Sequence, residues 1–278
     1  MRRLLLTSVV FILTMAPQLA GAGPRTIQVE PAAAVPPGFE TYRGYVFDLS
    51  ENADRKDGAA FAEAVRRQLD MVENAGFSPK VLQFFHSVPI LASEMTCLDE
   101  GAGIACYGPI SPERNQREAS TFTTWDEGKL RWSNPNFVDL AAGPGVIVVR
   151  PTLLKHAEDP VLLHEFLHAY HGKLMPQGFD NLGIRAYHAD AMSKQVFPKE
   201  EYAMKNHKEF FAVTASIFLA GKESMHEPKT RAQLKEKMPK YYKYLVELFG
   251  FDPDANTPVA STSSPPQQSS DAMAPGGT

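Results

Sequence analysis

Three residues near the middle of the chain combine metal-binding and proton-transfer chemistry. His164, Glu165 and His168 form the pattern H-E-x-x-H. On a helix, residues four apart lie on one face, so both imidazoles can reach a single cation. Glu165 is rotated by about 100° from His164, which brings its carboxylate beside the metal without ligating it. Because Zn²⁺ favours imidazole ligands with an open position for water, the pattern predicts a zinc site with Glu165 as general base.

A catalytic zinc site of this kind needs a third protein ligand. A metzincin carries glycine three residues after the second histidine and another histidine three residues later, but His171 and Leu174 occupy these positions. The other common solution is a carboxylate on a later helix, for which Glu209 is the best candidate. Asn206 leaves a second interpretation open, because the two residues also form a capping box in which Glu209 bonds backbone. His171 is a weaker ligand candidate.

The elements around these residues predict an α+β fold, with a mixed sheet followed by helices that carry the zinc ligands. A helix is expected where apolar residues recur at helical spacing, and strands where β-branched and aromatic residues cluster. The first third of the chain then has the order strand, helix, strand. The expected strands are residues 42–49, 80–91 and 145–150, and the expected helix is 59–74.

The later part of the chain is predicted to be helical. Asp159 is a good N-cap with Pro160 at the first helical position, and Gly172 is a natural stop. Asn206 and Gly221 bound a second helix in the same way. The expected helices are residues 160–171, 207–220 and 230–249, the last of them broken at Pro239.

The segment from Pro151 to Gly221 resembles a known peptidase family. A tyrosine lies seven residues before the candidate carboxylate ligand, which begins a helix rich in Phe and Ala. This combination resembles the family of the anthrax lethal factor catalytic domain, a gluzincin-type H-E-x-x-H family that also includes the proline-proline endopeptidases. The residues that carry the resemblance are His164-Glu165-Phe166-Leu167-His168, Tyr202, Asn206 and Glu209-Phe210-Phe211-Ala212.

The resemblance implies a fold, a ligand set and a catalytic role for one further residue. The fold is a zincin-like metallopeptidase domain, and Glu209 is the third zinc ligand. Tyr202 is implied as a hydrogen-bond donor that stabilises the oxyanion of the tetrahedral intermediate. The chain departs from the family at Val213, where the family has a second acid. A carboxylate that orients a ligand histidine is therefore expected from elsewhere.

Charge and cysteine content exclude several classes of protein. The chain has 278 residues, a formal net charge of −4 and a pI near 6.1, so it has no basic excess to neutralise the phosphates of a nucleic acid. Two cysteines are too few for a four-thiolate zinc ribbon. Cys97 and Cys106 bracket a short loop and are expected to form a disulfide in an exported protein.

Both ends of the chain are expected to lie outside the folded domain. Residues 1–22 combine a basic start, an apolar run and small residues before Ala22, as a signal peptide does. The apolar run of about 13 residues is short of the roughly 20 that span a membrane, so stable membrane insertion is not expected. Residues 23–38 read as a flexible leader, 39–251 as the metallopeptidase domain and 252–278 as a disordered Ser/Pro/Gln-rich tail. Secretion or residence in the periplasm follows.

Together these features predict an exported zinc metalloendopeptidase that acts on a peptide or protein substrate. The strand Val146–Val149 is expected to pair with an extended substrate, as zincin edge strands do. Two alternatives remain open. One is a zinc-dependent amide hydrolase acting on cell-wall material, and the other is a non-catalytic zinc-binding or interaction protein. The sequence contains no signal for an oligomeric state.

Overall fold

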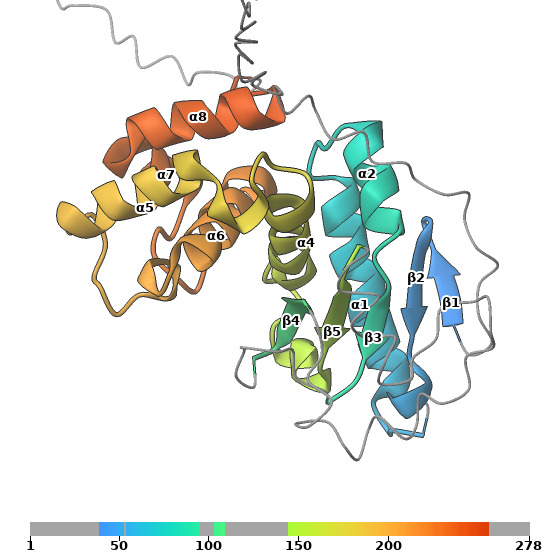
Figure 1. Cartoon of the computed structure of the whole chain (residues 1–278). Coiled ribbons are helices and arrows are strands. Elements are labelled where there is room, and N and C mark those ends of the chain that lie inside the picture. The colour runs from blue at the N-terminus through green and yellow to red at the C-terminus, as the bar shows by residue number, and fades with distance from the viewer. Residues whose placement is uncertain (1–38, 53, 95–102, 109–143, 256–278) are drawn as a thin grey trace, which may run out of the picture.

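A mixed sheet of short strands supports the helices that carry the candidate ligands (Figure 1). The computed structural model describes residues 39–52, 54–94, 103–108 and 144–255. Within them the sheet has the order β1-β2-β3-β5-β4, with antiparallel pairing at both ends and parallel pairing in the middle. The α+β class with a mixed sheet is as predicted. The strands are β1 (Phe39–Tyr42), β2 (Tyr45–Asp48), β3 (Ile90–Ala92), β4 (Ala105–Gly108) and β5 (Val146–Val149).

Strand β5 is an interior strand of this sheet. Its four residues are Val-Ile-Val-Val and all are buried, as expected for a strand covered on both faces. It pairs with β3 on one side and with β4 on the other. Its backbone groups are therefore taken, and the prediction that Val146–Val149 pairs with substrate is wrong. Among the described strands, β4 is the edge on this side of the sheet.

The predicted strand at residues 42–49 is the second half of a hairpin. Arg43 and Gly44 both have positive φ angles, 50° and 92°, and reverse the chain between β1 and β2. Two successive residues with positive φ are typical of a tight hairpin turn whose twist matches that of the strands. The Arg-Gly pair is not one of the usual Asn-Gly or Asp-Gly signals, so the local sequence does not predict this turn.

Two helices connect the hairpin to β3. Helix α1 (Gly58–Glu73) was predicted from its apolar spacing, and its buried face includes Phe61, Val65 and Leu69. Residues 80–91 were predicted to be extended, but most of them form α2 (Pro79–His86) before the chain enters β3. Ser78 followed by a proline at the first helical position is a helix-start signal that the apolar composition of the segment obscured.

The remaining chain is helical, and most boundaries follow local signals. Helix α6 has the predicted bounds, with Asn206 as N-cap and Gly221 as a left-handed C-cap. The break at Pro239 between α7 and α8 is confirmed. Helix α5 was not predicted. The helices are α4 (Val161–Lys173), α5 (Leu182–Ser193), α6 (His207–Ala220), α7 (Arg231–Lys237) and α8 (Pro239–Phe249), with the short 3₁₀ segments η1 (Ser50–Asn52), η2 (Pro151–Lys155), η3 (Gly178–Asp180) and η4 (Tyr202–Met204).

The start of α4 is capped by a residue from another helix. The helix begins at Val161 rather than Pro160, and Asp159 does not cap it. Instead, the amide oxygen of the fully buried Gln68 accepts a hydrogen bond from the Leu162 N–H at 3.0 Å. The same amide donates to the carbonyl oxygens of Ala157 at 2.9 Å and Asp159 at 2.6 Å. Gln68 thereby provides a partner for one of the N–H groups that the first turn of a helix leaves without an intrahelical acceptor.

The other end of α4 also differs from the prediction. Gly172 lies inside the helix, which continues to Lys173. A side chain at Gly172 would meet the Phe179 ring at 2.9 Å, so glycine is there for close packing with η3 rather than as a stop. Helix α4 packs against α1, β4 and α6, and it lies between α6 and α1 (Figure 1). These contacts hold the helix that carries the H-E-x-x-H segment in place.

The folded domain extends slightly beyond the predicted boundary at residue 251. The Tyr242 hydroxyl donates to Asp252 at 2.8 Å and lies 3.0 Å from Asp254, which also pairs with Arg231 at 2.9 Å. Residues 252–255 thus belong to the domain. The predicted signal peptide, leader and remaining tail lie outside the described residues. In the part of the chain that the structure describes, every helix is too short or too polar to cross a bilayer.

Candidate metal centre and catalytic site

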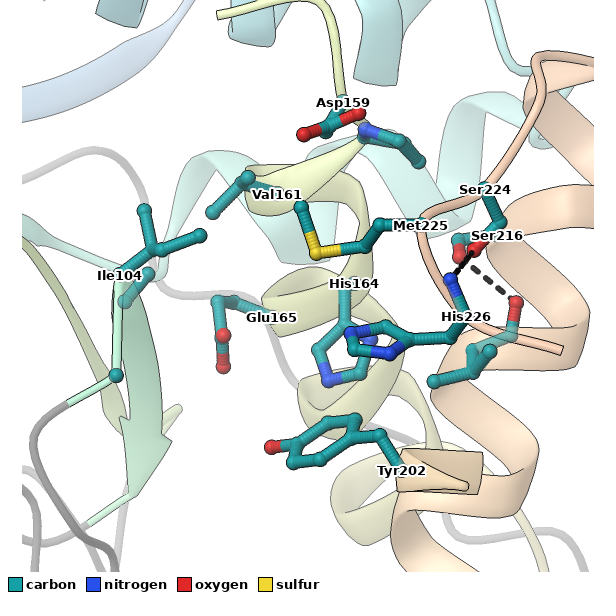
Figure 2. A pocket seen from close by; sticks show the side chains of 14 residues that line it. Ile104, Asp159, Val161, His164, Glu165, Tyr202, Ser216, Ser224, Met225 and His226 are labelled. Carbon is teal, nitrogen blue, oxygen red and sulfur yellow. Dashed lines mark hydrogen bonds between the residues drawn. The ribbon is translucent and has the colours of Figure 1, made fainter. Parts of the chain in front are cut away.

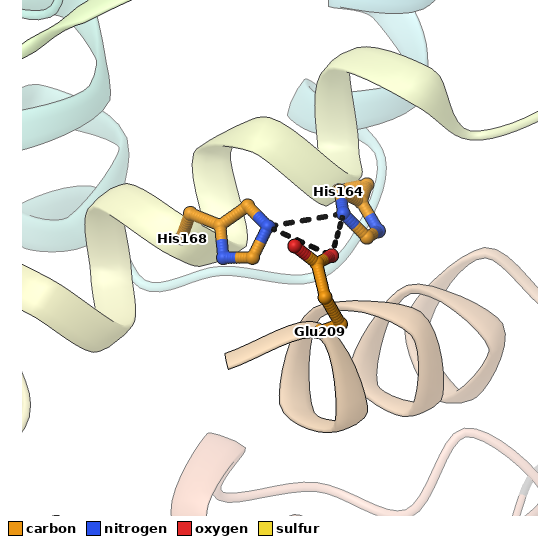
Figure 3. Close-up of side chains that lie close together, drawn as sticks. All are labelled: His164, His168 and Glu209. Carbon is orange, nitrogen blue, oxygen red and sulfur yellow. Dashed lines mark hydrogen bonds and ion pairs between the residues drawn. The ribbon is translucent and has the colours of Figure 1, made fainter. Parts of the chain in front are cut away.

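Three side chains from two helices converge on one point (Figure 3). His164 and His168 lie one turn apart on α4, and Glu209 reaches them from the first turn of α6. The two histidine Nε2 atoms are 3.0 Å apart. One carboxylate oxygen, Glu209 Oε2, lies 3.1 Å from His164 Nε2 and 3.4 Å from His168 Nε2. Among the described residues, these are the group of histidine, cysteine and acidic side chains close enough to hold a metal ion.

The spacing of these atoms fits a tetrahedral cation. Zinc bonds of about 2.0–2.1 Å at tetrahedral angles separate neighbouring ligand atoms by about 3.3–3.4 Å. The three observed separations are within a few tenths of an ångström of that value. Two imidazoles and one carboxylate are also a donor set of catalytic zinc sites, in which the fourth position stays open. The residues present therefore fit a zinc ion.

The Glu209 side chain faces the two histidines and does not cap its own helix. The Asn206 side chain accepts hydrogen bonds from the Lys208 N–H at 2.9 Å and the Glu209 N–H at 3.0 Å. Asn206 alone thus satisfies the helix start, and the Glu209 carboxylate turns toward α4. The fully buried Ala212 and Ala215 on α6 allow the two helices to approach closely.

Electrostatics favour the protonation states that a metal ligand needs. Burial by itself raises the pKa of Glu209, but hydrogen bonds from His164 and His168 outweigh burial and hold this pKa well below its usual range. Burial lowers the pKa of His168, although its bond to Glu209 opposes the shift. An ionised carboxylate beside a neutral imidazole is the combination that binds a cation without first releasing a proton.

A cavity of about 260 Å³ opens beside the metal ligands and contains both predicted catalytic residues (Figure 2). Glu165 is buried, 6% exposed, and its carboxylate points into the cavity from α4. Tyr202 enters from η4, with its ring 6.1 Å from the His164 ring. The structure therefore brings together all five residues predicted to bind the metal or to catalyse.

Several residues of the cavity were missed by sequence reasoning. Ile104, next to the edge strand β4, lines the cavity together with Val161 at the start of α4 and Val213 on α6. Met225 and His226 reach the cavity from the loop between α6 and α7. None of these belongs to a recognisable motif, and their spacing in the chain gives no signal, because the cavity is assembled from segments as far apart as Gly103 and His226.

Two further described residues with side chains that could ligate a metal, His188 and Cys106, are not part of the metal-binding group. His188 lies on α5, where it contacts the Met204 carbonyl oxygen at 3.3 Å and the ring of Phe210, and it is not among the cavity residues. Cys106 is buried on β4 and is disulfide-bonded. Its predicted partner, Cys97, lies outside the described residues, so the pairing itself stays a prediction.

His171 faces the core instead of the metal site. It is fully buried between the rings of Phe179 and Phe211, and neither ring nitrogen has a hydrogen-bond partner among the described residues. It is not part of the metal-binding group. Burial, aided by the charges of His168 and His207, lowers the pKa of His171 to about 3.

This buried histidine makes stability depend on pH in a direction that can be worked out. The pKa of His171 is near 6.5 in the unfolded chain and about 3 in the folded chain, so the unfolded state binds more protons between these values. The contribution of His171 to the free energy of unfolding is therefore fully present above pH 6.5 and is lost progressively as the pH falls toward 3. Between pH 7 and pH 4, the free energy of unfolding of the His171→Leu protein should fall by roughly 3 kcal/mol less than that of the wild type. Urea unfolding of both proteins at both pH values measures this difference, and equal losses would contradict it.

Comparison with known proteins adds one remote likeness. No protein-family profile matches the sequence, and no curated protein sequence matches it. Among solved structures, the chain is similar to the Pro-Pro endopeptidase PPEP-2 from Paenibacillus alvei, at 19% identity and a TM-score of 0.36. The match covers 69% of this chain and 92% of the other. A likeness this low carries no inference about activity, which must come from the residues of the site.

Proposed function

We propose that this protein is an exported zinc metalloendopeptidase with a zincin-like catalytic domain. The observation that carries the proposal is the convergence of His164, His168 and Glu209 beside a cavity that also contains Glu165 and Tyr202. A purely structural metal site needs neither a buried carboxylate beside the ligands nor a tyrosine at the cavity. The resemblance of the same residues to the lethal factor family supports the same assignment.

Each residue has a distinct task in peptide hydrolysis. His164, His168 and Glu209 would hold the zinc ion, which supplies a positive charge that lowers the pKa of water to about 7 and polarises a carbonyl oxygen. Glu165 accepts the proton of the attacking water and returns it to the leaving amine. The Tyr202 hydroxyl donates a hydrogen bond to the substrate carbonyl oxygen as that atom becomes negative.

The edge strand β4 is the best candidate to align a peptide beside this site. The Arg150 N–H donates to the Ile104 carbonyl oxygen at 2.9 Å, so the backbone groups of Ile104 face β5. In an antiparallel pair, successive residues alternate between facing the partner and facing away. The backbone groups of Ala105 therefore face the side of β4 that no described strand occupies, next to the cavity, where an extended substrate can add a strand.

The exported location and the domain limits complete the proposal. Residues 1–22 act as a signal peptide and 23–38 as a leader, which leads to secretion or periplasmic residence. A disulfide between Cys97 and Cys106 suits that compartment. The substrate is a peptide or protein.

The deciding experiment measures metal content and hydrolysis on one preparation. We expect about one zinc per chain by elemental analysis, cleavage of members of an unbiased peptide library, loss of cleavage after chelation, and recovery on adding zinc. Cleavage of cell-wall fragments but of no peptide would instead support the amide hydrolase. Bound zinc with no hydrolysis of either substrate class would support a non-catalytic zinc protein.

Tyr202→Phe tests the proposed oxyanion contact. The substitution keeps the ring next to His164 and removes the hydroxyl alone, so zinc content and melting temperature should not change. Loss of one donor to a developing oxyanion is expected to lower kcat about 10²-fold, with little change in KM. Steady-state kinetics on the best library peptide measures this effect. Unchanged kcat would show that Tyr202 only packs against the cavity.

A further inference from the structure

The loop between α6 and α7 contributes an aromatic side chain to the catalytic cavity. His226 lines the cavity together with His164, Glu165 and Tyr202 (Figure 2). We propose that His226 is a positioning residue for Tyr202: its imidazole stacks on the phenol ring and fixes the direction of the Tyr202 hydroxyl. This assignment rests on the peptidase function proposed above.

The contact between the two rings is close and nearly parallel. The centroids of the His226 and Tyr202 rings are 4.9 Å apart, and the ring planes differ by 28°. The Lys205 ammonium also lies over the Tyr202 ring, at 5.4 Å from its centroid. Because a phenol hydroxyl is at the far end of its side chain, a small rotation about χ1 displaces it by more than the ~1 Å that catalytic geometry tolerates. The stack opposes that rotation.

The loop that carries His226 is held in place on both sides of the histidine. The His226 N–H donates to Ser224 Oγ at 3.0 Å, and the Ser224 N–H donates to the Lys229 carbonyl oxygen at 2.8 Å. The Gln233 amide, from α7, donates to the Glu227 carboxylate at 2.6 Å. A loop held by these hydrogen bonds can restrain a neighbouring side chain, whereas a mobile loop cannot.

A second bond links the loop directly to the segment that carries Tyr202. The Glu227 N–H donates to the carboxylate of Glu201 at 3.1 Å, and Glu201 is the residue immediately before Tyr202. The loop therefore touches the catalytic segment through the backbone and through the ring. His226 is not one of the described residues that form the metal-binding group, and its ring contact in the cavity is with Tyr202.

Two substitutions at His226 distinguish the effect of the stacked ring face from the effect of the ring nitrogens. His226→Phe keeps an aromatic face and removes both nitrogens, whereas His226→Ala removes the stack. We expect His226→Ala to lower kcat between tenfold and about 100-fold with KM and zinc content unchanged, and His226→Phe to restore kcat to near the wild-type value. In a Tyr202→Phe background, His226→Ala should lower kcat no further. His86→Ala is the control, because His86 contacts Tyr45 and neither residue lines the cavity.

A readout without catalysis distinguishes failure of this proposal from failure of the proposed function. In protein with isotope-labelled tyrosine, the ring resonances of Tyr202 are assigned by their loss in Tyr202→Phe. They should move in His226→Ala, which removes the stacked ring, whether or not any peptide is cleaved. Unmoved resonances in His226→Ala would overturn the proposal. So would a His226→Phe protein as slow as His226→Ala, because that result assigns the effect to the nitrogens.

Discussion

Glu165→Gln is expected to leave the zinc content unchanged and to lower kcat about 10³-fold, within the range that general-base catalysis contributes. Glutamine has nearly the shape of glutamate, so the buried side chain on α4 still fits its place. It cannot accept a proton from water. Because Glu165 is outside the group of metal ligands, the charge at His164, His168 and Glu209 is not altered.

The measurement combines elemental analysis with peptide hydrolysis on matched preparations. Glu223→Gln is a suitable control, since it makes the same chemical change at an exposed position outside the cavity. Full activity in Glu165→Gln would remove the residue from the base role. Loss of zinc in Glu165→Gln would instead show that the carboxylate helps to bind the metal, which the geometry does not predict.

Glu209→Gln is expected to abolish both zinc binding and hydrolysis. The carboxylate provides the negative charge of the ligand set, and its oxygen is 3.1 Å from His164 and 3.4 Å from His168. An amide oxygen at that point is neutral and a weaker ligand. Because altering groups that merely support ligands already weakens metal affinity by about 10–100-fold, loss of a ligand should raise the zinc Kd by more than 100-fold.

The fold should survive this substitution, which makes the result interpretable. Asn206 caps α6 through backbone N–H groups, and the Glu209 side chain is not needed for that cap. Circular dichroism should therefore remain that of the wild type. Glu236→Gln, at an exposed position of α7, is the matched control. Undiminished zinc in Glu209→Gln would mean that another residue completes the site and that the lethal factor resemblance is misleading about the third ligand.

The two variants answer different questions. Glu165→Gln separates metal binding from hydrolysis, whereas Glu209→Gln removes both together. If both variants lose zinc, the two carboxylates act on the metal and no base has been identified. If neither variant affects hydrolysis, the peptidase function itself is wrong.

Much of the site follows from sequence alone, because its signals are local. The four-residue spacing of His164 and His168 requires only a helix, and that helix forms. Asn206 and Gly221 bound α6 as predicted, since a side-chain cap and a left-handed glycine act within one turn. Pro239 ends α7 for an equally local reason, the fixed proline φ and the missing N–H.

Tertiary structure decided what depends on residues distant in the chain. Asp159 is a residue type that commonly caps helices, but Gln68 on α1 caps α4 instead, because packing of the two helices brings its amide to the Leu162 N–H. Strand order turned β5 into an interior strand and left β4 at the described edge. The approach of His226 to Tyr202 likewise depends on how the α6–α7 loop folds back. Local periodicity and caps depend on neighbouring residues in the chain, whereas long-range pairing depends on which arrangement buries the apolar faces while pairing the buried backbone polar groups.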